Sequence, residues 1–385
     1  MLLKVLLFLI AFLVGADELM LGPLLAPIGA ELGVPPERVT LFITAYSVAL
    51  ALIAPLLGGL SDRHGRLRMM LPASLLFGAA SVATGLVASF EVGLVTRVIT
   101  GLASAGMLPI AFAMAADGAP ADAMKRIAWV QSGLTLGMIS SPAVGALLAQ
   151  LSSWRTPFIV LGLCAWAVAG ALAWLTARTP QVHASDTPPA PQGSVLAIPG
   201  ALGALLAMGL GLGGGIGLFN LVGQHLHDSQ GLPVWSVGLL YGALGVISVV
   251  GNVLMPRLAG YVESGRPLMR GALVVCALVS AFFYLYPAGS LASLALPLGL
   301  WALAGGIGSP ALQGYIAQLA PAQRGMLMSL AMTLMHLGVA LWSAVAGFAY
   351  SAGPMAMALL ALLLFGGAIL ALRPVRLPGR VQQAQ

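Results

Sequence analysis

Charged residues and cysteines are scarce in this sequence. Asp, Glu, Lys and Arg make up 7% of its 385 residues, and only two cysteines occur. Soluble globular domains hold about 25% charged residues, so the composition excludes an ordinary soluble enzyme or binding domain. Cys164 and Cys276 each lie inside an apolar run at no metal-binding or disulfide spacing, which excludes a disulfide framework and a cysteine-based metal site.

Apolar residues dominate instead. They account for 59% of the chain, with 49 glycines and a mean hydropathy of +1.00. A helix needs about 20 apolar residues to cross a hydrocarbon core of ~30 Å. The sequence therefore predicts an all-α integral membrane protein with twelve transmembrane helices, near residues 4–32, 39–60, 68–89, 92–117, 124–150, 156–178, 197–226, 234–259, 267–287, 291–319, 325–352 and 354–373.

The basic residues follow this topology. With both termini placed in the cytoplasm, fourteen of the seventeen Lys and Arg residues fall on the inner side, only Arg38 and Arg155 fall outside, and Arg97 lies within the fourth helix. This asymmetry is typical of multi-pass proteins, whose cytoplasmic loops are enriched in Lys and Arg. We expect a multi-pass protein of a bacterial inner membrane and no nucleic-acid partner, despite the net charge of +6.

The chain also predicts two related halves. A Pro-rich polar stretch, 179–196, follows the sixth predicted helix and is expected to be a cytoplasmic linker between bundles at 1–178 and 197–373, with a tail at 374–385. Shifting the sequence by 198 residues aligns Arg68 with Arg266. The expected architecture is two pseudo-symmetric six-helix bundles.

One short polar segment has a residue pattern that is too specific for a chance turn. GGLSDRHGRLR, residues 58–68, contains five ionisable groups in seven positions, and is expected to form a tight loop at a membrane face. Its pattern resembles the loop between helices 2 and 3 of the major facilitator superfamily, and the resemblance extends over essentially the whole chain. It implies the major facilitator fold and transport of a small molecule by alternating access, without an enzymatic reaction, resident metal or cofactor. We expect a monomer.

In that family the loop acts as a conformational latch. The resemblance implies that Asp62 accepts hydrogen bonds from the start of helix 11, where the helix dipole favours an anion. Arg66 or Arg63 would pair with Asp117 at the end of helix 4. The alternative is a basic loop that only orients membrane insertion. The expected latch residues are Gly58, Asp62, Arg63, Gly65, Arg66 and Asp117.

Three charged residues are predicted inside the bilayer: Asp17 and Glu18 on helix 1 and Arg97 on helix 4. Each costs ~2.5–3.5 kcal/mol on insertion scales and requires a partner. Counting ~1.5 Å per residue from Lys4 and from Glu91 places Asp17 and Arg97 at nearly the same depth. Arg97 and Gly101 resemble the family's helix-4 motif, which is associated with proton coupling. We expect Asp17 to carry the proton and Arg97 to modulate it; a purely structural ion pair is the alternative.

Adjacent residues of a helix point about 100° apart, so Asp17 and Glu18 are not expected to face the same direction. Which of the two faces the cavity stays open. Helix 5 carries a further pattern that resembles the signature of exporters and predicts close helix packing, although Ser141 and Ala146 replace glycines in it. Its residues are Gly133, Gly137, Pro142 and Gly145. A small-residue packing interface is the alternative.

Several polar residues within the predicted helices are candidates for a substrate cavity, or for hydrogen bonds between helices: Tyr46, Gln131, Asn220, Gln224, Tyr241 and Asn252. Helix 11 adds Met328, Met332, Met335 and His336 along one stripe. Such a stripe suits Cu(I), a promiscuous drug pocket or ordinary packing. We take Met332 and His336 as cavity candidates and predict no metal site.

Together these features predict a proton-coupled antiporter that exports a small amphipathic drug or metabolite, with the proton gradient as its energy source. An importer or facilitator of a nutrient or metal chelate would use the same fold. A membrane receptor or assembly factor with a transporter fold is the alternative from another class.

Overall fold

The computed structural model of the chain describes residues 2–117, 120–178, 194–231, 234–262, 264–286 and 291–373. The predicted linker, apart from its residues 194–196, and the predicted tail at 374–385 lie outside the described residues. Within them, twelve helices are long and apolar enough to cross a membrane, which confirms the predicted number of spans.

The first half contains α1 (Leu2–Met20), η1 (Gly22–Leu24), α2 (Leu25–Leu32), α3 (Pro36–Val39), α4 (Leu41–His64), α5 (Arg66–Leu86), α6 (Phe90–Ala105), α7 (Leu108–Ala116), α8 (Pro120–Leu151) and α9 (Arg155–Arg178). The second half contains η3 (Val195–Ala197), α10 (Ala201–Ala207), η4 (Met208–Gly213), α11 (Gly214–Phe219), α12 (Val222–Gln230), α13 (Val234–Ala259), α14 (Gly265–Leu285), α15 (Leu291–Leu319), η5 (Pro321–Gln323), α16 (Arg324–Ala352) and α17 (Pro354–Ala371).

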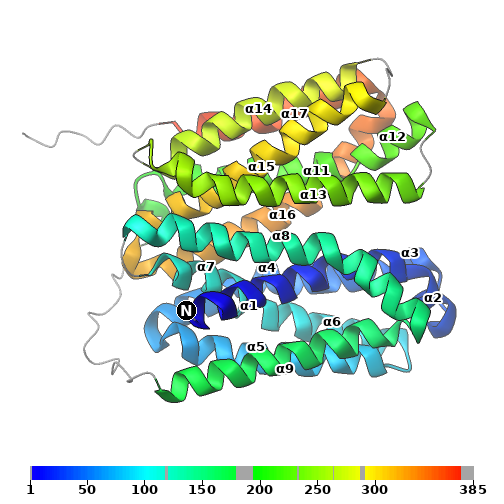
Figure 1. The fold of residues 1–385 in the computed structure, drawn as a ribbon, viewed down its shortest axis with the longest axis vertical. Helices are drawn as coiled ribbons and strands as arrows, with labels where there is room; N and C mark the ends of the chain where they lie inside the picture. Colours follow the sequence, from blue (N-terminus) through cyan, green and yellow to red (C-terminus); the bar gives the residue numbers. More distant parts are fainter. Residues whose placement is uncertain are drawn as a thin grey trace, which may run out of the picture.

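The two halves lie side by side and meet along α8 with α13 and along α4 with α16 (Figure 1). Large apolar side chains cover the outside, such as Leu278 and Leu363, which are 64% and 72% exposed. Water would make such a surface unfavourable, whereas lipid accommodates it. The helical backbone satisfies its own polar groups, as a segment in hydrocarbon must.

One end of the bundle is basic. Here α1 begins and α4 ends, and the Nε1 of Trp129, near the start of α8, donates to the carbonyl of Lys4 at 3.1 Å. We call this the basic end; it carries Lys4, Arg66, Lys125, Arg266 and Arg324. The far end, with α2, α3 and α12, lies opposite (Figure 1).

The polar segment at 58–68 is mostly helical, which corrects the predicted loop. α4 continues to His64 and α5 begins at Arg66, so that Gly65 alone separates them. Gly65 has φ 92° and ψ 136°, a conformation that L side chains rarely adopt. A single glycine thus reverses the chain and keeps Asp62 and Arg66 on ordered helix ends.

Three predicted helices are interrupted. In predicted helix 1, the first segment α1 ends at Met20, and η1 and α2 follow it. Predicted helix 4 breaks at Gly106, between α6 and α7. Pro109, in the first turn of α7, has no N–H to donate to a continuous helix. In helix 7 the glycine-rich run forms the π-helical segment η4. Hydropathy could not locate these breaks, because the apolar character continues through them.

The turn at Gly65 gives a stability prediction. Replacing Gly65 by Ala should lower the free energy of unfolding by about 1–3 kcal/mol, since the backbone conformation is strained for any side chain. No atom lies within 4 Å of a Cβ at this position, so packing adds nothing to the loss. Unfolding of purified protein in detergent measures the effect.

Gly170 is the matched control, because it lies within α9 and a Cβ there would also meet nothing within 4 Å. Gly170→Ala should be neutral or stabilise by about 0.5–1 kcal/mol. Equal effects of both substitutions would contradict the backbone argument.

Candidate functional site

A buried ion pair joins α1 to α6 in the middle of the first half. Arg97 Nη1 donates to Asp17 Oδ1 at 2.8 Å, and the side chains are 1% and 0% exposed. The two residues therefore lie at one depth, as the residue counting predicted. A buried pair of this kind fixes the orientation of both helices, because removal of one partner leaves a charge without compensation.

Tyr46 of α4 completes this group. Its ring centroid lies 4.8 Å from the Arg97 guanidinium carbon, within range of a cation–π interaction. Gly101 permits the approach, because a Cβ at this position would overlap the carbonyl oxygen of Tyr46. Among the described residues, Asp17 Oδ2 and Arg97 Nε are buried without a hydrogen-bond partner. The group thus retains unused donors and acceptors.

Glu18 points to the other half. Its Oε1 lies 3.3 Å from Nε2 of His336 on α16, and the two side chains are 14% and 10% exposed. The neighbouring carboxylates of α1 are therefore divided: Asp17 binds a partner within its own half, and Glu18 contacts the second half. The sequence could not assign these directions, because hydropathy gives depth but not helix rotation.

Asp62 holds the basic end of α4 against the start of α16. Its two carboxylate oxygens accept hydrogen bonds from the backbone N–H groups of Gly325 and Met326, both at 2.9 Å. A helix N-terminus has unpaired N–H groups and a partial positive charge, which stabilise an anion. This is the contact that the resemblance implied.

Asp117, which follows α7, extends the contact into a small ionic network. Arg66 Nε lies 2.5 Å from its Oδ2 and also binds Asp62 at 3.0 Å. Arg324, at the start of α16, lies 2.5 Å from Asp117 Oδ1 and thereby links the two halves. Arg324 was not identified from the sequence. Its position at the start of the helix that was expected to contact Asp62 could have indicated its role.

The remaining latch residues differ in their placement. Gly58 lies against α16, where a Cβ would overlap Ser329 Oγ and the Gly325 carbonyl. Arg63 is exposed and takes no part in the network around Asp117. Of the two arginines offered by the sequence, the structure therefore pairs Arg66 with Asp117.

The glycines of the helix-5 motif let α8 approach α1. A Cβ at Gly133 or Gly137 would overlap the carbonyl oxygen of Phe8 or Phe12, and one at Gly145 would lie 2.9 Å from the Cγ of Met20. Pro142 lies within α8 between these contacts. The motif thus packs α8 against the helix that carries Asp17 and Glu18.

Two of the cavity candidates, Gln131 and Asn252, lie at the interface between the halves. Gln313 Nε2 of α15 donates to Gln131 Oε1 at 2.8 Å, and Asn252 Nδ2 of α13 donates to Thr135 Oγ1 of α8 at 3.1 Å. Gln313 was missed in the sequence, where its helix shows no pattern beyond apolarity. These side chains are buried and connect the halves on the side opposite the latch helices α4 and α16.

The other candidates separate into two sets. Asn220, Gln224 and Tyr241 lie toward the far end of the second half; Tyr241 accepts from Gly223 N and donates to the carbonyl of Phe219, which braces the break between α11 and α12. Met332 is buried beside His336 on α16. The described residues contain no group of three or more His, Cys, Asp or Glu side chains that could hold a metal ion.

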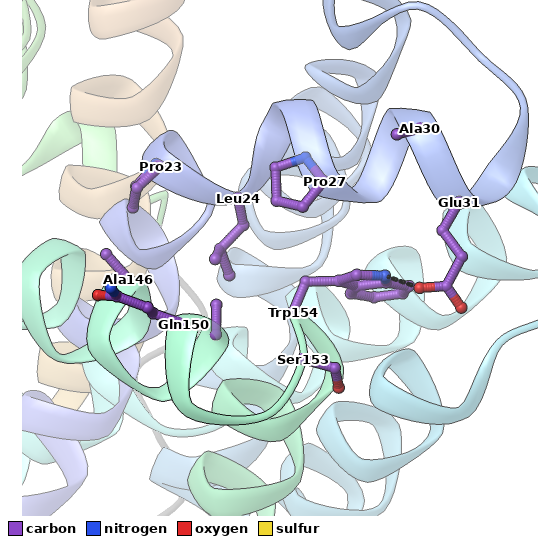
Figure 2. A pocket seen from close by; sticks show the side chains of 10 residues that line it. Pro23, Leu24, Pro27, Ala30, Glu31, Ala146, Gln150, Ser153 and Trp154 are labelled. Atoms are coloured by element: carbon purple, nitrogen blue, oxygen red, sulfur yellow. Dashed lines mark hydrogen bonds between the residues drawn. The ribbon is translucent and has the colours of Figure 1, made fainter.

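A surface groove of about 700 Å³ lies at the far end, between α2 and the end of α8 (Figure 2). Trp154 Nε1 donates to Glu31 Oε2 at 2.6 Å, and Arg155 binds the other oxygen at 2.7 Å. These bonds, that of Arg155 first, lower the pKa of the Glu31 carboxyl below its ordinary value. The groove contains none of the charged residues of the membrane core.

Comparison with known proteins agrees with this architecture. The Major Facilitator Superfamily profile matches residues 7–342. The chain is 26% identical over 354 residues to YceJ, an uncharacterized MFS-type transporter of Bacillus subtilis, covering 89% of this chain and 88% of that protein. It is also 29% identical over 263 residues to the chloramphenicol resistance protein of Streptomyces lividans, covering 66% of this chain and 67% of that protein.

The bacillibactin exporter of B. subtilis is 36% identical over 147 residues, 36% of each chain. Among solved structures, the human organic anion transporter MFSD10 superposes with a TM-score of 0.79 at 21% identity, covering 97% of this chain and 99% of that one. This likeness confirms the expected fold of two six-helix bundles.

The contact of Asp62 with α16 predicts that Asp62→Asn will loosen the basic end. The asparagine side chain has an NH₂ group in place of one carboxylate oxygen, and this group cannot accept a hydrogen bond from a backbone N–H. The substitution therefore removes one of the two hydrogen bonds to α16, and a hydrogen bond to a charged group contributes about 1.5–3 kcal/mol. Alkylation of a cysteine placed at the buried Ser329 should accelerate by about tenfold or more, measured in a Cys164→Ala background.

Asp122→Asn is the control, since Asp122 is exposed and binds only Lys125 among its described ion pairs, at 3.4 Å. It should leave the alkylation rate unchanged. A rate that is equally unaffected by Asp62→Asn would show that this carboxylate does not hold the halves together.

The pair of Asp17 and Arg97 predicts a non-additive cycle of substitutions. Asp17→Asn or Arg97→Gln alone should lower the free energy of unfolding by about 3–5 kcal/mol, because each leaves a buried charge without its partner. The double variant should be more stable than the sum of the two losses implies. Chemical unfolding measures all three, and strictly additive losses would refute the coupling.

Proposed function

The chain belongs to the Major Facilitator Superfamily and is a multi-pass membrane transporter; from this premise we propose that it is a proton-coupled antiporter. It exports a small amphipathic drug or metabolite across a bacterial inner membrane by alternating access. The observation that carries this proposal is that three charged residues, Asp17, Arg97 and Glu18, lie in ion pairs among membrane-spanning helices.

The direction of transport is supported by relatives. One is named for chloramphenicol resistance and another for export of bacillibactin. The helix-5 glycines, which the structure packs against α1, fit the same direction through their resemblance to the exporter signature. Export of an amphipathic compound is the function common to these observations.

Proton coupling follows from the cost of charge in hydrocarbon. An ionised carboxylate with no partner is unfavourable by several kcal/mol, so it either keeps a cation or takes up a proton. Asp17, Glu18 and Arg97 form the proton-coupling group, in which occupancy by a proton alternates with substrate. Asp17 Oδ2, which has no hydrogen-bond partner among the described residues, offers one site for such a proton.

Alternating access is supported by the ionic contacts at the basic end. We assign this end to the cytoplasm, because it collects the Lys and Arg residues of the loops. This assignment places both termini and the linker on the cytoplasmic side. We further propose that the protein works as a monomer. Release of Asp62 and Asp117 from α16 opens the cytoplasmic side.

The substrate lies between the halves near the middle of the membrane, where transporters of this architecture place it. Its surroundings are Tyr46, Gln131, Asn252, Met332 and His336. Met332 and Tyr46 supply adaptable apolar area for an amphipathic compound.

Transport into inverted membrane vesicles tests the proposal. Vesicles with an acidified interior should accumulate radiolabelled chloramphenicol or the cationic dye ethidium, because inward pumping by an inverted antiporter is driven by outward proton flow. Asp17→Asn should reduce accumulation to the level of vesicles that lack the protein, whereas Glu91→Gln, at the exposed start of α6, should leave it unchanged.

Accumulation that does not depend on the proton gradient would refute the coupling. Gradient-driven uptake by intact cells, with no loading of inverted vesicles, would instead establish an importer.

A further inference from the structure

The histidine that contacts Glu18 has one ring nitrogen already committed. His336 Nδ1 lies 2.9 Å from the carbonyl oxygen of Met332, one turn earlier in α16. A carbonyl oxygen only accepts hydrogen bonds, so Nδ1 must carry a proton. The tautomer of the neutral ring is therefore fixed, and its Nε2 has a lone pair directed away from the helix backbone.

This constraint determines what lies between His336 and Glu18. A hydrogen bond between Nε2 and Oε1, which are 3.3 Å apart, requires one proton. That proton resides either on Nε2, giving an imidazolium and a carboxylate, or on Oε1, giving a neutral imidazole and a carboxylic acid. Without it, a nitrogen lone pair faces a carboxylate oxygen, and the contact becomes repulsive.

The contact also crosses from one half to the other. Glu18 belongs to α1 in the first half, and His336 to α16 in the second. The start of α16 is held by Asp62 and, through Arg324, by Asp117, and Thr333 of α16 donates to the carbonyl of Ala51 at 2.7 Å. The contact of His336 with Glu18 is a further link between this helix and the first half. A proton between Glu18 and His336 thus adds to the contacts that keep the basic end closed.

We propose that Glu18 and His336 form a proton-binding site shared by the two halves, and that its single proton stabilises the state in which the basic end is closed. The site rests on the proposed antiport and adds, beside Asp17, a second position at which a proton can bind. Release of that proton removes the contact and favours separation of α16 from α1.

The neighbouring charges fit this assignment. Among the described residues, the titratable and charged groups around the pair are Asp17, which is adjacent to Glu18 on α1, its partner Arg97 on α6, and Tyr46 on α4, which interacts electrostatically with Glu18. Asp17 is bound to Arg97 at 2.8 Å, and both side chains are buried. Asp17 and Arg97 thus compensate each other within the first half, whereas Glu18 and His336 are the pair that joins the two halves.

Distance measurements across the basic end test the proposal without any substrate. Spin labels at Lys125→Cys and Tyr261→Cys report on the two halves, since both positions are exposed near this end. In lipid nanodiscs and a Cys164→Ala background, the ratio of closed to open molecules should fall as the pH rises between about 5 and 8. A one-proton linkage gives a slope of up to about tenfold per pH unit.

Two substitutions replace the shared proton by a permanent one. The Glu18→Gln amide donates to Nε2, and the His336→Gln amide donates to the Glu18 carboxylate, so each variant should keep the closed state with little pH dependence. His64→Gln is the matched control, because His64 is exposed and its one hydrogen bond within the described part of the chain is to the carbonyl of Leu60 in its own helix. It should retain the full pH dependence.

Retention of the wild-type pH dependence in both Glu18→Gln and His336→Gln would overturn the proposal. This result is separable from failure of antiport, because vesicle transport driven by a proton gradient can succeed while the distances remain unaffected by either substitution. Loss of pH dependence in His64→Gln as well would likewise overturn it.

Discussion

An ionised side chain in hydrocarbon must have a partner, and this requirement arranges the interior of the protein. Asp17 is compensated by Arg97 within one half, which locks α1 and α6 together. Asp62 is compensated by the N-terminus of a helix from the other half, and Asp117 by arginines from both. The first contact lies within one half, whereas the second and third join the two halves.

The contact within one half and the contacts between the halves differ in the free-energy cost of breaking them. Breaking the Asp17–Arg97 pair would strand two charges in a dry interior, at a cost comparable to a substantial fraction of the stability of a domain. Breaking the contacts of Asp62 and Asp117 exposes groups that lie at a bundle end and can be hydrated. The pair within one half thus lies at depth, and the ionic contacts of Asp62 and Asp117 with the other half lie at the basic end. Glu18 and His336 also join the halves, but at the depth of Asp17.

The sequence predicted the depth of the charged residues in the membrane and the kind of partner each requires. It did not predict the rotation of each helix about its axis. Counting residues placed Asp17 level with Arg97, and the motif around Asp62 indicated the start of α16 as its partner. The partners Arg324, His336 and Gln313 depend on how helices distant in sequence turn toward each other, which hydropathy does not encode. The breaks at Gly106 and in η4 were hidden for a related reason, since an apolar run stays apolar whether or not its hydrogen bonds shift register.

The π-helical segment η4 bears on which substitutions can change the selectivity of the transporter. Gly213 in this segment packs directly on the backbone of α16, where a Cβ would lie 2.6 Å from the Met335 carbonyl oxygen and 2.9 Å from Gly338. Any larger residue must displace the stretch of α16 that holds His336. A variant with altered selectivity can therefore arise from a position that never meets the transported compound, and a search confined to the lining of the transport path would overlook it.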